Sequence, residues 1–290
     1  MIKTGNVILA GAGRSNISKL LPHTLMQLLM IATCAVALFP IYFMVVNSFK
    51  LRDEFIINIL GFPRNFTLQS FIDSFRGKNF PLWFLNSVFI TAASCVTTSF
   101  IAVFAAFAFA KMEFSGRRKI FSMLIPLMSI PPVIMLIPQF KIMSAVNLIN
   151  NGWSVIILYI GIMLPLTIYL MRNYFITLPT ALLEAAKVDG ASQFKVILHV
   201  ILPLSVPVMF TALLVNAVWA WNELLIALVF LQREELRTLI VGITIFKSRF
   251  SLNVPVIMAG LTIATIPVIL LYIFGQKYLI AGLLAGAVKE

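Results

Sequence analysis

The stretch FLNSVFITAASCVTTSFIAVFAAFAFA, residues 84–110, contains no charged residue and decides the class of fold. About 20 apolar residues in a helix cross the ~30 Å hydrocarbon core of a bilayer, so this stretch is long enough to span a membrane. Inside hydrocarbon the backbone must satisfy its own hydrogen bonds, and a helix does so within one segment. We therefore predict a membrane-spanning helix here.

Similar apolar stretches recur along the whole chain. The chain has 290 residues, of which 61% are hydrophobic and 11% charged, and its mean hydropathy is +1.01. Soluble domains are about half apolar and about a quarter charged. We predict an all-α, polytopic membrane protein with six transmembrane helices, at residues 24–46, 84–110, 120–143, 153–175, 204–231 and 255–279.

The third of these stretches is rich in proline. Pro126, Pro131, Pro132 and Pro138 each lack a backbone N–H, so the helix over 120–143 is expected to be kinked and shielded by neighbouring protein. The two cysteines, Cys34 and Cys95, both lie inside apolar stretches and form no metal-binding spacing.

The first apolar stretch has two interpretations. The polar residues 1–23 followed by an apolar run resemble a signal peptide, with Ala35-Val36-Ala37 as a cleavage site. However, the run continues through Val46, which is longer than the core of a signal peptide. We predict an uncleaved helix, a transmembrane domain over 24–279 and a tail over 280–290.

The basic residues indicate the orientation. The loop at 111–119 contains Lys111, Arg117, Arg118 and Lys119, whereas the loop at 147–152 contains no basic residue. Short cytoplasmic loops are the ones enriched in Lys and Arg, so this loop and both termini are predicted to be cytoplasmic. The same distribution explains the net charge of +12 without nucleic acid as a partner.

Residues 178–203 are too polar to span a bilayer, yet their pattern is helical. Pro179 and Thr180 suit a helix start, and Gly190 after Asp189 suits a helix end in the left-handed conformation. Ser192 can cap a second helix, which Leu202-Pro203 is expected to break. The prediction is a helix–turn–helix on the cytoplasmic face, with an ordinary amphipathic interfacial loop as the alternative.

The motifs of this segment resemble a known family. Glu184-Ala185-Ala186, Asp189-Gly190-Ala191 and Leu202-Pro203-Leu204 resemble the EAA loop of bacterial ABC importer permeases. Further matches follow the carbohydrate-uptake, MalG-like branch of that family and extend the resemblance over about residues 24–289. They are Asn86-Ser87, residues 105–111 and 114–117, Pro165-Leu166, Leu170-Met171-Arg172, Trp219-Ala220-Trp221-Asn222-Glu223, Gln276-Lys277-Tyr278 and residues 282–289.

The resemblance implies a permease subunit, not an enzyme, in the bacterial cytoplasmic (inner) membrane. It implies as partners a second, different permease, two copies of a cytosolic ABC ATPase, an extracytoplasmic solute-binding protein and membrane lipid. ATP and Mg would bind to the ATPase, because this chain lacks a G-x-x-x-x-G-K-[ST] loop, and no cofactor or metal is expected here. The residues that would couple to the ATPase are Glu184, Ala185, Ala186, Asp189, Gly190 and Ala191.

Polar and aromatic residues inside the fifth stretch are candidates for the substrate pathway. Polar groups inside a membrane usually face the bundle interior or a wet cavity. A sugar site needs amides and a stacking ring, so the candidates are Asn216, Trp219, Trp221, Asn222 and Glu223. The favoured alternative is that these residues fix helix packing or gate the outer mouth.

Two other classes of protein fit these residues less well. An ion-coupled secondary transporter would need a buried acidic relay and an internal repeat, but Glu223 is the one acid expected inside a span. An intramembrane enzyme would need converging titratable groups, of which the spans hold very few. The residues favour a sugar or oligosaccharide importer subunit over both.

Overall fold

A computed structural model describes residues 17–76, 79–249 and 253–287, which form helices and contain no strand. Four helices are long and apolar enough to cross a membrane, and the number rises to six if each of two sharply bent helix pairs counts as one span. The predicted all-α membrane fold is confirmed. The four long helices are α1 (Ile17–Ser48), α4 (Phe80–Lys111), α7 (Gly152–Thr177) and α14 (Val254–Ala287).

Two of these helices begin at residues that suit a helix start. The first turn of α4 contains Pro81, whose missing N–H needs no partner there. At the start of α7 the Oδ1 atom of Asn151 accepts a hydrogen bond from the backbone N–H of Trp153 at 3.0 Å. The last helix, α14, continues into the segment that was expected to form a separate C-terminal tail.

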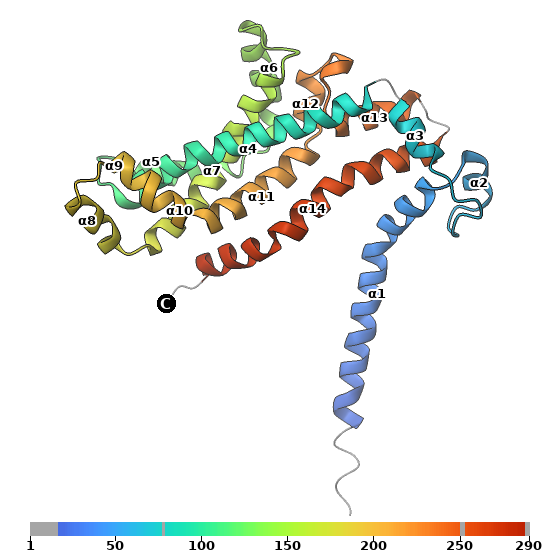
Figure 1. Cartoon of the computed structure of the whole chain (residues 1–290), viewed down its shortest axis with the longest axis horizontal. Helices are drawn as coiled ribbons and strands as arrows, with labels where there is room; N and C mark the ends of the chain where they lie inside the picture. Colours follow the sequence, from blue (N-terminus) through green and yellow to red (C-terminus); the bar gives the residue numbers. More distant parts are fainter. Residues whose placement is uncertain (1–16, 77–78, 250–252, 288–290) are drawn as a thin grey trace, which may run out of the picture.

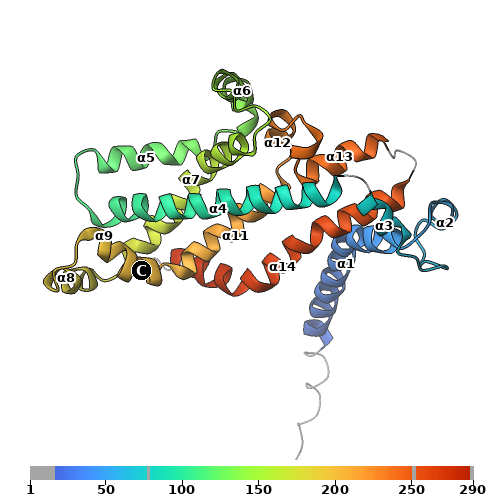
Figure 2. The same ribbon diagram turned by 45° about the horizontal axis from the view of Figure 1, so that its top comes forward.

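The third predicted span is broken rather than kinked. It consists of α5 (Arg117–Leu127), the 3₁₀ turn η1 (Pro132–Met135) and α6 (Leu136–Ala145), with 98° between its two halves. The prolines remove backbone donors around Ser129, so the helix cannot continue. As a result α6 projects from the body beside α12 (Leu225–Phe230) (Figures 1 and 2).

The fifth predicted span, 204–231, is also interrupted. Its main helix, α11 (Val206–Asn222), meets the preceding helical segment at 74°. Glu223 is extended and separates α11 from α12. The preceding segment consists of α9 (Gln193–Val196), the π-helical turn η2 (Ile197–Ile201) and α10 (Leu202–Leu204).

The expected break at Leu202-Pro203 is wrong by a few residues, because the chain bends at Ser205. Pro203 lies in the first turn of α10, directly after the wider π-helical turn, so it is tolerated in a continuing helix. Pro207 then lies in the first turn of α11. Helical direction therefore changes between two prolines and not at the first one.

Shorter elements connect the long helices at one end of the body. They are α2 (Arg52–Ile57), α3 (Gln69–Arg76), the 3₁₀ turn η3 (Glu234–Leu236) and α13 (Leu239–Arg249). Fully buried Lys50 joins the end of α1 to the end of α2. Its Nζ donates to Asn47 Oδ1 at 2.8 Å and to the carbonyl of Asn58, which follows α2, at 2.6 Å.

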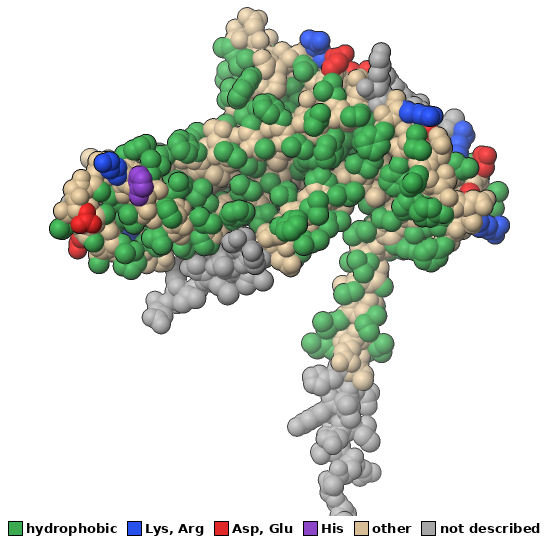
Figure 3. Space-filling model, viewed as in Figure 1, with side chains coloured by type: hydrophobic (Ala, Val, Ile, Leu, Met, Phe, Trp, Pro, Cys, Tyr) green, Lys and Arg blue, Asp and Glu red, His purple; other side chains and the backbone are tan. Residues whose placement is uncertain are grey.

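The body is built around the α4–α7 pair, with α11 packed along this pair and α14 packed against α11 (Figure 2). By contrast, α1 descends away from the bundle and buries little beyond its last residues, Val46 to Ser48 (Figure 1). Figure 3 shows a largely hydrophobic face, with the charged side chains at its left and right ends and along its upper edge. This distribution fits a bilayer as the solvent of the middle zone.

The uncharged turn between α6 and α7 generates a prediction. Asn150, at φ 58°, accepts at Oδ1 from the backbone N–H groups of Gln232 (2.8 Å) and Arg233 (2.9 Å), and so holds the chain that follows α12. We expect Asn150→Ala to destabilise the protein by about 1–2 kcal/mol, because both donors lose their partner. Thermal unfolding in detergent measures this loss.

The matched control is Asn147→Ala. Asn147 has nearly the same backbone conformation, φ 57°, but its side chain does not bridge to that chain. Equal destabilisation by both substitutions would show that backbone strain, and not the Asn150 acceptor, sets the stability of this turn.

Candidate functional site

The segment at 178–203 forms a helix, a tight turn and a second helix. Its first helix, α8 (Thr180–Val188), is closed by a turn at Gly190, whose φ is +74°. The backbone N–H of Ala191 donates to the carbonyl of Ala186 at 3.0 Å, which is the 6→1 bond of a Schellman closure. The second helix is capped at Ser192, whose Oγ accepts from the N–H of Lys195 at 3.4 Å.

The outer surface of this turn is exposed. Glu184, Ala185, Asp189 and Gly190 are exposed, and Val188 keeps 88% of its surface accessible. A Cβ added to Gly190 would meet no atom within 4 Å. The other two alanines of the motif, Ala186 and Ala191, pack instead against the core cluster formed by residues of α4, α7, α9, η2 and α11. The motif therefore divides into an outward face and an anchoring face.

Both ends of the segment are fixed to the long helices. Nζ of Lys111, the last residue of α4, donates to the carbonyl of Leu178 at 2.6 Å. The hydroxyl of Tyr174, on α7, donates to the carbonyl of Leu204 at 2.9 Å. Between these two points Phe194 stacks on Phe104 of α4, with the ring centroids 5.9 Å apart. These three contacts join the segment to α4 and α7.

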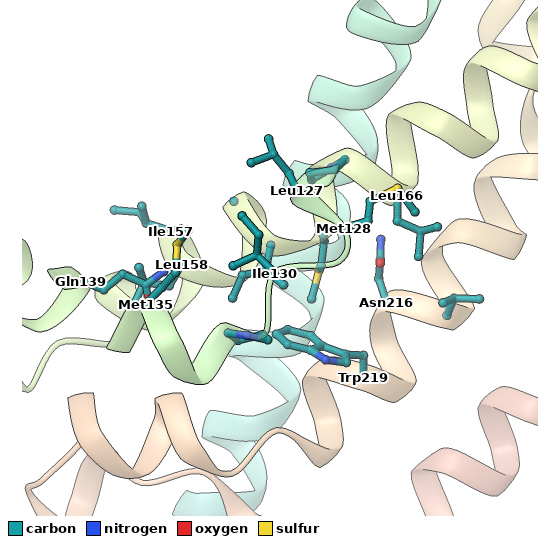
Figure 4. Close-up of a pocket in the computed structure, with 16 residues that line it drawn as sticks. Leu127, Met128, Ile130, Met135, Gln139, Ile157, Leu158, Leu166, Asn216 and Trp219 are labelled. Carbon is teal, nitrogen blue, oxygen red and sulfur yellow. The ribbon is translucent and has the colours of Figure 1, made fainter. Parts of the chain in front are cut away.

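A cavity of about 510 Å³ lies between the bent α5–α6 pair, α7 and α11 (Figure 4). Most of its wall is apolar, and two candidate residues from α11 line it, Asn216 and Trp219. Buried Asn216 donates from Nδ2 to Thr167 Oγ1 at 2.8 Å, and Trp219 meets the Tyr159 ring edge-on at 5.1 Å between centroids. The cavity thus combines an amide and a ring on an apolar background.

Gln139 is a further polar residue of this cavity that the sequence analysis missed. It lies on α6, and its Oε1 atom is buried without a hydrogen-bond partner among the residues that the structure describes. An unsatisfied buried oxygen costs roughly 1–3 kcal/mol, so its retention next to a cavity points to a ligand or water that donates to it. The available signal was an amide after Pro138 in an otherwise apolar span, but only the bend turns it toward α11.

The other three pathway candidates lie outside this cavity. Trp221 is buried and donates from Nε1 to the Ala264 carbonyl of α14 at 3.0 Å, and Asn222 donates to the Val218 carbonyl of its own helix. Glu223 accepts from the Tyr159 hydroxyl at 2.8 Å and from the backbone N–H groups of Ile226 and Ala227. Trp221 and Glu223 thus join α11 to α14 and α7, whereas the Asn222 bond stays within α11.

Comparison with known proteins identifies the family. Residues 98–284 match the model of the binding-protein-dependent transport system inner membrane component family. The probable ABC transporter permease YurM of Bacillus subtilis is 33% identical, over 87% of this chain and 83% of that protein. The trehalose/maltose transport permease MalG of Thermococcus litoralis is also 33% identical, over 88% of this chain and 92% of that protein.

Two further relatives extend the comparison. The sulfoquinovosyl glycerol transport permease SmoH of Agrobacterium fabrum is 34% identical, over 87% of this chain and 89% of that protein. A crystal structure of a bacterial ABC transporter that imports alginate superimposes with a TM-score of 0.78 at 25% identity, covering 93% of this chain and 99% of that one. The resemblance drawn from residues 184–191 is confirmed: the chain belongs to the binding-protein-dependent transport system inner membrane components, the non-enzymatic permease subunits of ABC importers.

Proposed function

We propose that this chain is one of two different permease subunits of an importer for a sugar or oligosaccharide. The observation that carries the proposal is the exposed turn at Gly190. The segment that contains this turn is hydrogen-bonded to α4 at its start and to α7 at its end. Relatives named for trehalose/maltose, sulfoquinovosyl glycerol and arabinooligosaccharides support the sugar class. In this proposal two copies of a cytosolic ATPase bind ATP and Mg, and a solute-binding protein delivers the sugar.

The proposed coupling runs through α8. Its exposed face, with Glu184, Ala185 and Gly190, docks on the ATPase, while Ala186 and Ala191 hold it to the helices above. When the ATPase pair closes, α8 moves, and the bonds from Lys111 and Tyr174 transmit the movement to α4 and α7. Because α7 also lines the cavity, the same movement alters the cavity.

The proposed orientation follows from this docking. The end of the body that holds α8 also holds Lys111 and the basic residues at 117–119, as expected on a cytoplasmic face. Both termini are then cytoplasmic if each bent pair is one span, which gives six spans. The apolar and largely exposed α1 meets lipid or the second permease subunit.

We propose further that the cavity is this chain's share of the sugar pathway. Trp219 offers a stacking surface, and Gln139 and Asn216 offer amides for sugar hydroxyls. An ion-coupled mechanism is not favoured, because the carboxylate of Glu223 is held by a hydroxyl and two backbone N–H groups as a helix cap. A relay acid would need free exchange of its proton.

Substitution at Gly190 tests the coupling. We expect Gly190→Val to reduce binding-protein-stimulated ATPase activity of the reconstituted complex about tenfold, because a left-handed β-branched residue costs at least about 1–2 kcal/mol. Gly190→Asn is the matched control, since asparagine tolerates this conformation, and it should stay within about twofold of wild type. Normal assembly, ATPase stimulation and transport in the valine variant would show that the turn at Gly190 does not couple the permease to the ATPase.

Substitution at Gln139 tests the cavity. Gln139→Leu keeps the side-chain size but removes the amide, so we expect the KM for uptake of the transported sugar to rise about tenfold, as for one lost hydrogen bond. A screen of labelled sugars in cells that express the complex first identifies that sugar. Asn222→Leu, outside the cavity, should leave the KM unchanged. An unchanged KM in both variants would show that the sugar does not pass through this cavity.

A further inference from the structure

A second, smaller cavity lies at the end of the body that holds α8. It has a volume of about 310 Å³ and is lined by Arg117, Arg118 and Arg172 together with Phe109 and Phe121. Its residues come from three helices: the end of α4, the first turns of α5 and the last turns of α7. Neither the coupling turn nor the sugar cavity includes any of these five residues.

None of the three arginines of this pocket forms an ion pair with another described residue. The one ion pair within 4.0 Å in the described part of the chain joins Arg233 to Glu235, far along the sequence. Arg117 donates to the Met112 carbonyl at 2.7 Å and Arg172 to Asn173 Oδ1 at 3.2 Å, and both acceptors are uncharged. Arg117 also repels Arg172. Like charges held together in this way favour an anion between them.

Arg172 is positioned as the inner wall of the pocket. Its guanidinium carbon lies 4.5 Å from the centroid of the Phe121 ring, and this contact fixes the plane of the group. Its Nε atom is buried and has no hydrogen-bond partner among the described residues. A buried donor on a charged group is costly to leave without an acceptor. Because no described residue supplies one, we expect a ligand to provide the acceptor in this pocket.

The depth of the pocket indicates where that acceptor comes from. Phe109 is two residues from the end of α4, and Arg172 is five residues from the end of α7, so the arginines lie where the apolar spans end. Ile120, Met123 and Ile125 of α5 are exposed next to it, and α5 has no buried residue. An apolar surface rising from a basic pocket matches the acyl chains and headgroup of a lipid.

We propose that this arginine pocket binds the phosphate of an anionic phospholipid, with the acyl chains lying along α5. Guanidinium groups bind phosphate through paired, charge-assisted hydrogen bonds, and basic pockets between transmembrane helices on the cytoplasmic side are lipid headgroup sites. The proposal rests on the proposed orientation for its assignment to the cytoplasmic leaflet. The bound lipid bridges α5 and α7 close to the loop that carries α8.

Lipid retention tests the proposal. The complex, purified through a tag on this chain, is placed in nanodiscs of phosphatidylcholine with an equal amount of phosphatidylglycerol, and the lipids that stay bound are measured by native mass spectrometry. Wild type should retain phosphatidylglycerol over phosphatidylcholine at least about tenfold. The double variant Arg117→Gln, Arg172→Gln should lose this preference, and Arg233→Gln, outside the pocket, should keep it.

Two further variants guard against a folding defect. Arg118 is exposed, so Arg118→Gln should fold normally and lower the preference in part. Arg172→Lys keeps the charge but loses the planar group, and should also bind the lipid more weakly than wild type. Undiminished preference in the double variant overturns the proposal.

The remaining arms separate the alternative ligands. Millimolar inorganic phosphate should not displace the retained lipid; displacement would make the pocket a free-phosphate site. Loss of the ATPase subunit with lipid retention intact would make it a protein-docking surface. Labelling of Ser115→Cys by an impermeant maleimide in right-side-out and inside-out vesicles reports the orientation separately, so an error in the proposed topology is distinguishable from failure of lipid binding.

Discussion

The fold depends on one constraint: hydrocarbon offers no hydrogen bonds, so a transmembrane helix can break only where protein groups satisfy the freed backbone. The break after α11 illustrates how this is done. The carboxylate of Glu223 accepts the backbone N–H groups of Ile226 and Ala227, and the Tyr159 hydroxyl from α7 donates to the same carboxylate. The bend at Ser205 is held by the Ser205 hydroxyl on the Ile201 carbonyl and by Tyr174 on the Leu204 carbonyl. Each break is thereby tied to α7 or to the preceding turn.

The breaks shape the two features on which the proposed function rests, the cavity and the segment that carries α8. An unbroken third span would run past α7, whereas the 98° bend between α5 and α6 encloses a cavity and brings Gln139 to its wall. The 74° bend before α11 sets the direction of α11 apart from that of the preceding segment, which carries α8. Proline and serine at these bends therefore determine where the polar residues can lie.

The sequence predicts the helices well because apolar length is a strong signal, and it predicts the turn at Gly190 because few residues adopt a positive φ. It does not predict where a proline-rich span breaks, since Pro203 and Pro207 are both tolerated in first turns and the bend falls between them. Helical periodicity could have separated the pathway candidates. Asn216 and Trp219 are three residues apart and share a face, whereas Trp221 is rotated by about 140° from Asn216. Glu223 lies beyond the helix, where periodicity no longer applies.

Three contacts tie the segment at 178–203 to the long helices. Lys111 holds its start to α4 at the Leu178 carbonyl, and Tyr174 holds its end to α7 at the Leu204 carbonyl. The stacked Phe104 and Phe194 rings join its second helix to α4. In the proposed coupling, a movement of α8 reaches α4 and α7 through these contacts. The helical hydrogen-bond pattern is interrupted at Ser205 and Glu223, at the two ends of α11. Because α11 carries Asn216 and Trp219 and α7 lines the same cavity, any shift of α7 relative to α11 would change the shape of that cavity.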